Sequence, residues 1–399
     1  MKICIAGKNN IAIDVCQHII ENYPKEHIFI ITNKNDIGID GFQRSFLKYA
    51  KEKRLTICNL EDVYGLENLL FISLEFDRII KPKLFLSKQL FNIHFSLLPS
   101  YKGMYTSAIP LLMGEKYTGV TLHCIDQGID TGDIIAQQKI LIDKKETCKS
   151  LYEKYIKTGT ELVIQNIDNL INNKYEKFAQ PIENSTYFSK SYIDYSNITI
   201  NLNSTAYQIA QQIAAYNFRD YQLPLIYGHK VIGCKFTNEK SKQKPGTILN
   251  ESKDKYLLST IDYDIIVYKD CFNILLDICK NDKINELRTF PLLEYYIKEK
   301  DPIHGWSPLI IAAYNNSTQV FEYLLKYGAE INDRNYNGTT VIMYAKDAAL
   351  KYNDYRIIDL CLKYGGNPLL KDYNGMNLYD YLKQQSIHLF NYIKAKNND

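Results

Sequence analysis

Hydrophobic positions near the start of the chain alternate between strand-like and helix-like spacing. Short runs of mostly β-branched residues lie at 3–6, 28–31 and 55–58. Between them, segments 11–23 and 42–53 carry apolar residues at helical intervals. Strands that alternate with helices form a parallel sheet with helices on its faces. The pattern therefore predicts an α/β fold with a Rossmann-like domain at the start of the chain.

Further strands are expected at 69–73, 91–95 and 119–125, with a helical segment at 107–113. Gly7 follows the first strand, but the Gly-x-Gly-x-x-Gly spacing is absent, so a dinucleotide site of that type is disfavoured. Sheets of this kind bind ligands at the carboxyl ends of their strands. We therefore expect the functional residues on the loops at that edge.

The pattern changes in the second half of the chain. An alternating stretch at 194–200, a helical segment at 204–215 and four short strands between 231 and 269 predict a small strand-rich domain. The polar stretch 180–185 suits a boundary between the two domains.

The tail is repetitive. Gly305-Trp306-Ser307-Pro308-Leu309 recurs 33 residues later as Gly338-Thr339-Thr340-Val341-Ile342. A period of this length resembles ankyrin repeats, which are all-α units of a turn and two helices. The predicted organisation is thus a Rossmann-like domain at 1–185, a strand-rich domain at 186–284 and ankyrin repeats at 285–399.

Composition and charge narrow the class of protein. Hydrophobic residues make up 46% and charged residues 23%, which is ordinary globular usage. The net charge of +3 comes from scattered basic and acidic residues, so we expect no nucleic-acid partner. No apolar run is long enough for a membrane span, and the start does not resemble a signal peptide. Nine cysteines without a Cys-x-x-Cys pair indicate reduced thiols and a cytoplasmic location.

The candidate chemistry lies around two segments. Strand alternation places Asn92 and His94 on one face at the carboxyl end of their strand. The glycine-rich stretch Gly128-Ile129-Asp130-Thr131-Gly132-Asp133 can bring a carboxylate to that histidine. Taken alone, the strand histidine can be structural, the asparagine a turn former, and the acidic stretch an ordinary or metal-binding loop. Together, an amide donor and a histidine base suit acyl transfer to an amine.

The combined pattern resembles a known family. The resemblance lies in three successive strings. They are Asn-x-His-x-Ser-Leu-Leu-Pro from Asn92, Gly-Val-Thr-Leu-His from Gly119 and Asp-x-Gly-Ile-Asp-Thr-Gly-Asp from Asp126. In these strings the chain resembles the 10-formyltetrahydrofolate-dependent formyltransferases. The resemblance covers about residues 1–180. It implies that Asn92 holds the formyl oxygen, that His94 takes the proton of the attacking amine, and that Asp130 orients and polarises the imidazole. It implies 10-formyltetrahydrofolate as co-substrate and no metal.

The resemblance also implies two looser groups of binding residues. The cofactor-binding candidates are Phe76, Asp77, Arg78, Ile79, Ile125, Asp126, Gln127 and Asp133. The substrate-binding candidates are Lys102, Met104, Tyr105, Lys190, Phe218, Arg219, Tyr221 and Trp306. Aromatic residues beside one arginine at 218–221 can stack a thymine and neutralise a pyrophosphate, although the same residues also suit a core position.

The acceptor is suggested by the domain arrangement. A formyltransferase domain followed by a short strand-rich domain looks like the nucleotide-sugar N-formyltransferases. The added ankyrin tail resembles the subset of these enzymes that acts on dTDP-linked 3-amino-3,6-dideoxyhexoses. The sugar would then have the glucose or the galactose configuration. That resemblance implies a role in O-antigen or other cell-surface polysaccharide synthesis, and a homodimer formed through the middle domain.

Alternatives remain open from the sequence alone. They are a 4-amino sugar nucleotide or another amine as acceptor, a hydrolase of 10-formyltetrahydrofolate, and an ankyrin-tethered scaffold with a decayed enzyme domain. Trp306 lies on a repeat turn, where it is either a packing anchor or part of an auxiliary ligand surface. The repeats can also bind a protein.

Overall fold

The computed structural model describes residues 1–396 and divides into two compact units. The first comprises Met1–Glu251 and Tyr256–Val267, and the second comprises Ser252–Lys255 and Tyr268–Asp399. The last three residues of the predicted ankyrin segment, 397–399, lie outside the described residues. The division of the chain into three domains at 185 and 284 stays a prediction.

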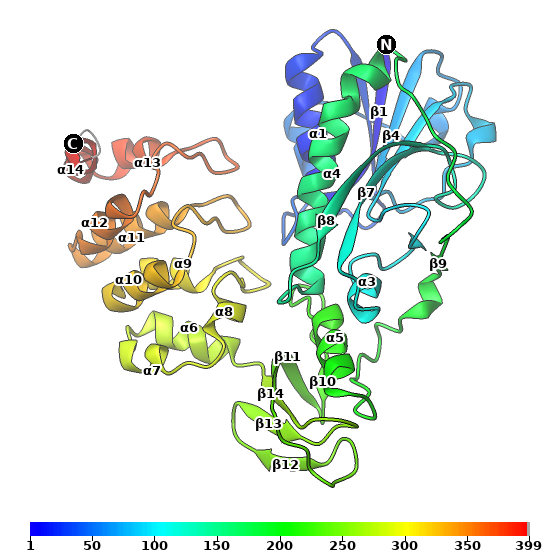
Figure 1. Cartoon of the computed structure of the whole chain (residues 1–399). Coiled ribbons are helices and arrows are strands. Elements are labelled where there is room, and N and C mark those ends of the chain that lie inside the picture. Colours follow the sequence, from blue (N-terminus) through cyan, green and yellow to red (C-terminus); the bar gives the residue numbers. More distant parts are fainter. Residues whose placement is uncertain (397–399) are drawn as a thin grey trace. The chain divides into compact units, whose positions relative to one another are not determined.

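A seven-stranded sheet forms the centre of the first unit, in the order β3-β2-β1-β4-β5-β7-β8 (Figure 1). Its strands are β1 (Lys2–Gly7), β2 (His27–Thr32), β3 (Thr56–Ile57), β4 (Leu69–Leu74), β5 (Gln89–His94), β7 (Tyr117–Cys124) and β8 (Ile134–Leu141). Neighbours from β3 to β5 run parallel, whereas β7 runs antiparallel to β5 and β8. The sheet is therefore mixed, although the βα alternation predicted a parallel one.

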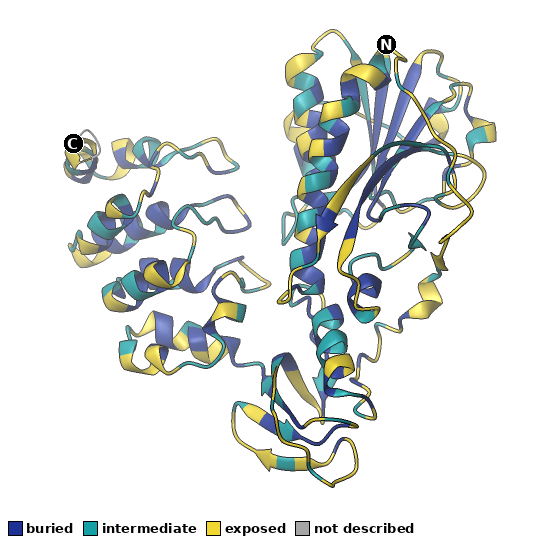
Figure 2. Cartoon of the chain, viewed as in Figure 1, coloured by how far each residue is buried: buried dark blue, intermediate teal, exposed yellow. Residues whose placement is uncertain are grey.

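Helices and loops cover both faces of this sheet. They include α1 (Asn9–Asn22), α2 (Phe46–Glu52), α3 (Ile109–Leu112), α4 (Cys148–Ile171), and the short 3₁₀ turns η1 (Glu61–Val63) and η2 (Pro82–Leu84). One apolar cluster joins α1 and α4 to inward-facing Ile5, Ile72 and Ile93, and a second covers the opposite face. The central strands are buried on both sides, which explains their nearly continuous hydrophobic sequence (Figure 2).

Two elements of this unit are absent from the sequence prediction. Helix α4 begins with a capping box at Thr147 and contributes Tyr152 and Tyr155 to the core. Strand β8 pairs along its length with β7. The predicted helix 42–53 is shorter in the structure, because α2 starts only after Ser45, whose side chain accepts from the N–H of Lys48.

A five-stranded sheet with one helix follows. The sheet has the order β10-β11-β14-β13-β12 and is packed by α5 (Ala206–Tyr216). Its strands are β10 (Leu225–Ile226), β11 (His229–Phe236), β12 (Ile248–Glu251), β13 (Lys255–Leu258) and β14 (Ile265–Lys269). The predicted strand 194–200 does not form, and only an isolated bridge joins Thr199 to Leu225. Before this sheet, β6 (Lys102–Gly103) pairs with β9 (Tyr187–Phe188), followed by η3 (Lys190–Tyr192).

The second unit is a stack of helix pairs joined by turns. Its helices are α6 (Phe272–Lys280), α7 (Ile284–Arg288), α8 (Leu293–Tyr296), α9 (Pro308–Tyr314), α10 (Thr318–Tyr327), α11 (Val341–Tyr352), α12 (Arg356–Lys363), α13 (Leu378–Gln385) and α14 (Ile387–Lys396). Gly338 lies in a turn at φ +77°, and a Cβ there would come within 2.8 Å of the Tyr373 ring on the next turn. Successive turns therefore touch, as expected for stacked repeats.

Within residues 1–396, no helix is long and apolar enough to cross a membrane.

Candidate active site

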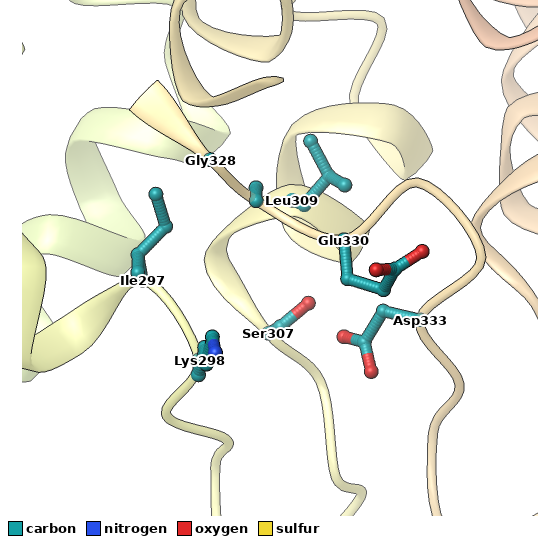
Figure 3. Close-up of a pocket in the computed structure, with 8 residues that line it drawn as sticks. Ile297, Lys298, Ser307, Leu309, Gly328, Glu330 and Asp333 are labelled. Carbon is teal, nitrogen blue, oxygen red and sulfur yellow. The ribbon is translucent and has the colours of Figure 1, made fainter. Parts of the chain in front are cut away.

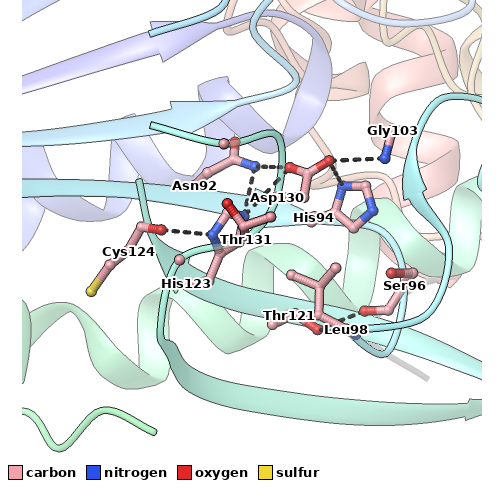
Figure 4. Close-up of polar contacts among 12 residues, drawn as sticks. Asn92, His94, Ser96, Leu98, Gly103, Thr121, His123, Cys124, Asp130 and Thr131 are labelled. Atoms are coloured by element: carbon pink, nitrogen blue, oxygen red, sulfur yellow. Dashed lines mark hydrogen bonds and ion pairs between the residues drawn. The ribbon is translucent and has the colours of Figure 1, made fainter. Parts of the chain in front are cut away.

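The catalytic candidates meet where β5 and β7 pair (Figure 4). Asn92 and His94 lie on one face of β5, as strand alternation predicted. The antiparallel register places His123 of β7 directly opposite Asn92. Asp130 comes from the loop between β7 and β8 and reaches both residues of β5. The structure thus brings the three predicted side chains together and adds a fourth.

The two ring nitrogens of His94 have different partners. Nε2 lies 2.8 Å from the main-chain carbonyl oxygen of Tyr101. Because a carbonyl only accepts, Nε2 carries the hydrogen and Nδ1 keeps its lone pair. Nδ1 lies 3.4 Å from Oδ2 of Asp130. A proton taken up at Nδ1 would therefore form an ion pair with this carboxylate.

Burial sets the charge states of this pair. The His94 side chain is only 8% exposed. Burial lowers the pKa of His94 below its usual value, against the opposing effect of Asp130 and the Tyr101 carbonyl. For Asp130, burial would raise the pKa, but His94, His123 and the N–H of Gly103 outweigh it and lower the pKa to about 2. A neutral base thus lies beside a permanent carboxylate.

His123 orients the amide of Asn92. Its Nδ1 lies 2.8 Å from the carbonyl oxygen of Cys124, so Nδ1 carries the hydrogen and Nε2 is the acceptor. Nδ2 of Asn92 donates to that acceptor at 3.1 Å. The other contact of Nδ2, to Asp130 Oδ1, is 3.5 Å and long for a hydrogen bond. The second N–H of Asn92 is therefore the one that can turn to a developing oxyanion.

The Asp130 loop is held by main-chain contacts. The N–H of Gly103 donates to Asp130 Oδ2 at 3.0 Å. Nε2 of Gln180 donates to the carbonyls of Asp130 at 2.9 Å and Gly132 at 2.8 Å. Gly132 passes so close to β7 that a Cβ would lie 1.9 Å from the carbonyl oxygen of Cys124. Glycine is thus required for the loop to fold back.

The cofactor candidates lie on two loops at the carboxyl edge. Phe76 and Ile125 pack against the same apolar cluster, so the loops after β4 and β7 border one face. The guanidinium of Arg78 lies 4.6 Å from the centre of the Phe76 ring, and Ile79 is 71% exposed. Phe76 and Ile125 are half-buried, so Ile79 is the exposed apolar side chain among these candidates.

The acidic members of that group have local partners. Asp77 Oδ2 accepts from the N–H of Lys34, and Asp126 Oδ1 accepts from Gly128 and Thr131 within its own turn. Asp133 forms an ion pair with Lys177 at 3.0 Å. These three carboxylates shape their loops. Gln127 is exposed.

Four substrate candidates cluster along the β6–β9 pairing. Nζ of Lys102 donates to Ser185, and the hydroxyl of Tyr105 donates to the carbonyl of Lys190. Met104 is 45% exposed, and Lys190 is also exposed. The 102–105 loop and the 185–190 segment thus form one ledge beyond the catalytic strand.

The candidates at 218–221 divide between core and surface. Phe218 is 4% exposed and packs edge-on against Phe42 at 5.3 Å, whereas Tyr221 is 62% exposed. The Phe218 and Tyr221 rings lie 4.6 Å apart. Arg219 is half-buried beside them. Tyr221 is therefore the ring of this group that can stack on a base, and Phe218 supports it.

Trp306 lies in the second unit, within an aromatic group on the turn side of the repeats. Its Nε1 donates to the hydroxyl of Tyr344 at 2.7 Å, and the His304 ring stacks on it at 4.9 Å. The indole is half-buried.

A separate hollow of about 330 Å³ lies between the repeats (Figure 3). Glu330 and Asp333 lie together on one side of it, across from Ile297 and Lys298. Asp333 is already neutralised by Lys300 at 2.8 Å. Across residues 1–396, no group of three His, Cys, Asp or Glu side chains is arranged to hold a metal ion.

Comparison with known proteins shows the family to which the chain belongs. Residues 5–167 match the family described as formyl transferase, and residues 267–372 match three copies of the ankyrin repeat. The N-formyltransferase from Helicobacter canadensis, solved with folinic acid and dTDP-3-aminofucose, is 44% identical, with a TM-score of 0.63 over 68% of this chain and 100% of its own. The chain belongs to the formyltransferase family.

Two further proteins are similar to this formyltransferase. WlaRD, a sugar 3N-formyltransferase solved with dTDP and 5-N-formyl-tetrahydrofolate, is 44% identical, with a TM-score of 0.62 over 67% of this chain and 97% of its own. The methionyl-tRNA formyltransferase of Malacoplasma penetrans is 33% identical over 184 residues, which is 44% of this chain and 55% of that protein. The chain thus spans about half the length of these curated relatives, the methionyl-tRNA formyltransferases of Malacoplasma penetrans and Clostridium tetani.

Proposed function

We propose that this formyltransferase moves the formyl group of 10-formyltetrahydrofolate to the 3-amine of a dTDP-linked 3-amino-3,6-dideoxyhexose. The observation that supports the chemistry is the buried His94, whose Nδ1 lies 3.4 Å from the Asp130 carboxylate, while the Asn92 amide lies on the other side of that carboxylate (Figure 4). The sugar class rests on the likeness, over their whole length, to the Helicobacter enzyme and WlaRD.

The co-substrate supplies the formyl carbon, and the residues of the site manage charge and protons. The sugar amine forms a bond to that carbon while the bond from carbon to the folate N10 breaks. Asn92 donates to the formyl oxygen as negative charge develops on it. Nδ1 of His94 takes the proton that the amine loses and returns it to N10, with Asp130 stabilising the imidazolium between the two transfers.

The finer assignments belong to the same proposal. Residues 76–79 and 125–127 would hold the folate, and the 102–105 ledge with Lys190 would line the sugar side. Tyr221 and Arg219 would receive the thymine and the pyrophosphate. Trp306 would mark an auxiliary site for the same ligand on the repeats, which also remain open to a protein partner. A cytoplasmic homodimer that supplies formylated sugars for O-antigen synthesis completes the proposal.

The test is formyl transfer by the purified chain. Protein and 10-formyltetrahydrofolate are incubated with dTDP- and UDP-linked 3-amino and 4-amino sugars, and nucleotide-sugar mass is followed. We expect a dTDP-3-amino sugar to gain one formyl group, and His94→Asn to lower the rate about 100- to 10,000-fold. Formylation of a 4-amino sugar alone would refute the acceptor assignment. Formate release without any acceptor would indicate a hydrolase, and loss of folate binding would favour a scaffold.

A further inference from the structure

The order of strands changes direction between β1 and β4. From β1 the chain proceeds outward through β2 and β3, then returns to β4 and continues to β5 on the other side. In open α/β sheets, the crevice at the carboxyl ends of the strands beside such a switch point binds ligands. Three polar side chains from different elements meet there in this chain. They are Asn9 at the start of α1, Glu75 directly after β4, and Tyr152 on α4.

These side chains form one hydrogen-bonded group around a carboxylate. The hydroxyl of Tyr152 lies 3.0 and 2.9 Å from the two carboxylate oxygens of Glu75. Nδ2 of Asn9 donates to Glu75 Oε2 at 3.1 Å and to the Tyr152 hydroxyl at 2.8 Å. A carboxylate has about four acceptor positions, so these two donors leave room for another. Tyr152 is 9% exposed, whereas Glu75 keeps an intermediate exposure.

The group is adjacent to the catalytic strand. In the parallel register of β4 and β5, Ser73 lies beside Asn92 and Leu74 beside Ile93. Glu75 follows at φ +57°, where the chain leaves β4 at the same carboxyl edge of the sheet at which β5 ends with His94. The Tyr152 ring also packs 6.2 Å from that of Phe95, the residue after His94. A sugar whose amine reaches His94 at this edge could extend its neighbouring groups over the end of β4, toward Glu75.

The charge and the lone pairs of Glu75 decide which part of a nucleotide sugar it can bind. Burial raises the pKa of this carboxyl, whereas Lys8, Tyr152 and Asn9 favour its ionised form. A carboxylate repels a diphosphate and accepts from hydroxyls. In a 3-amino sugar, the 2-hydroxyl adjoins the anomeric carbon that carries the diphosphate, and the 4-hydroxyl lies on the far side of the amine. We propose that Glu75, held by Tyr152 and Asn9, accepts a hydrogen bond from the 4-hydroxyl and so determines which 4-epimer is formylated. This inference rests on the function proposed above.

The experiment combines enzyme variants with substrate analogues. Formyl transfer is measured for the wild type, Glu75→Gln and Tyr152→Phe, with the better of dTDP-3-amino-3,6-dideoxygalactose and -glucose and with its 4-deoxy and 2-deoxy analogues. We expect Glu75→Gln to lower kcat/KM about 10- to 100-fold on the parent sugar and on the 2-deoxy analogue. On the 4-deoxy analogue, the kcat/KM of Glu75→Gln should lie within about 2-fold of the wild-type value, because that analogue lacks the hydroxyl that Glu75 would bind.

Matched controls separate recognition from folding. Glu294→Gln removes a carboxylate that accepts from the Tyr327 hydroxyl at 3.2 Å in the second unit, and it should change none of these rates. Tyr152→Phe should shift the same substrate preference more weakly, because it leaves the carboxylate in place. Equal losses on all three sugars would mean that Glu75 only supports the fold, and would overturn the proposal, as would a preference that follows the 2-hydroxyl.

Failure of the proposed function gives a different result. If the wild type formylates neither epimer, the proposed acceptor is wrong. The role of Glu75 is then tested by measuring the binding of the same sugars by calorimetry. Weaker binding of one parent sugar by Glu75→Gln, with unchanged binding of its 4-deoxy analogue, would support the site. Equal affinities for wild type and variant would overturn it.

Discussion

Replacing Asp130 with asparagine removes a charge but keeps the size of the side chain. Oδ2 of Asp130 lies 3.4 Å from Nδ1 of His94, with side-chain exposures of 13% and 8%. Opposite unit charges at that distance attract by about 5 kcal/mol in an effective dielectric constant of about 20. Water and loop relaxation reduce this value, so we expect the variant to lose about 3 to 5 kcal/mol of stabilisation of the protonated base.

This loss predicts both the rate and its pH dependence. A barrier higher by about 3 to 5 kcal/mol corresponds to a fall in kcat of about 160- to 5,000-fold. Burial already lowers the pKa of His94, so the wild type should hold its plateau down to pH values below about 6.5. Without the carboxylate, that pKa falls further, and the acid limb of kcat/KM should move to lower pH in Asp130→Asn.

The assay is the rate of formyl transfer between pH 5 and 9 for both proteins. Asp143→Asn is the control, because Asp143 also pairs with a basic side chain, that of Lys154 at 2.6 Å, but is 63% exposed. Surface pairs of this kind contribute about 1 kcal/mol or less, so its kcat should change little. If Asp130→Asn keeps a wild-type plateau, or changes only KM, Asp130 does not stabilise the imidazolium.

Three further substitutions follow from the geometry. His123→Phe removes the acceptor of Asn92 and should lower kcat about 10-fold at constant KM in steady-state kinetics, and His123→Gln, which can still accept, should recover part of that loss. Gly132→Ala places a Cβ 1.9 Å from the Cys124 carbonyl, so the loop must shift and kcat should fall about 100-fold; an unchanged rate would show that the loop is not needed in this form. Gly338→Ala should reduce the free energy of unfolding in urea by about 2 to 3 kcal/mol, because it combines a φ of +77° with a contact 2.8 Å from the Tyr373 ring. Gly328→Ala, at φ +109° with open space around it, should lose about 1 kcal/mol less.

Features that depend on local periodicity could be predicted from the sequence. Alternation along one strand was enough to place Asn92 and His94 on a common face. The 33-residue period indicated the repeats, which the comparison with ankyrin confirms. The βα alternation identified the α/β class, although β7 and β8 run antiparallel and make the sheet mixed.

Contacts set by long-range register could not be predicted. His123 is a functional candidate only once β7 is known to run opposite β5, although its place in the Gly-Val-Thr-Leu-His string was a signal. The main-chain carbonyl of Tyr101 contacts His94, and the side-chain amide of Gln180 donates to the main-chain carbonyl of Asp130. Contacts to main-chain atoms of this kind cannot be predicted from residue types. Glu75 and Tyr152 lie 77 residues apart and meet only because α4 packs on the face of the sheet to which Ile72 and Leu74 of β4 contribute.

The four side chains of the reaction centre lie on β5, on β7 and in the loop that follows it, within one continuous stretch of sequence. The residues that we propose to contact the acceptor come instead from the end of β4, from α4 and from the segment after α5. Substitutions at the acceptor-contacting positions can therefore change which amine is formylated and leave the catalytic segment unchanged.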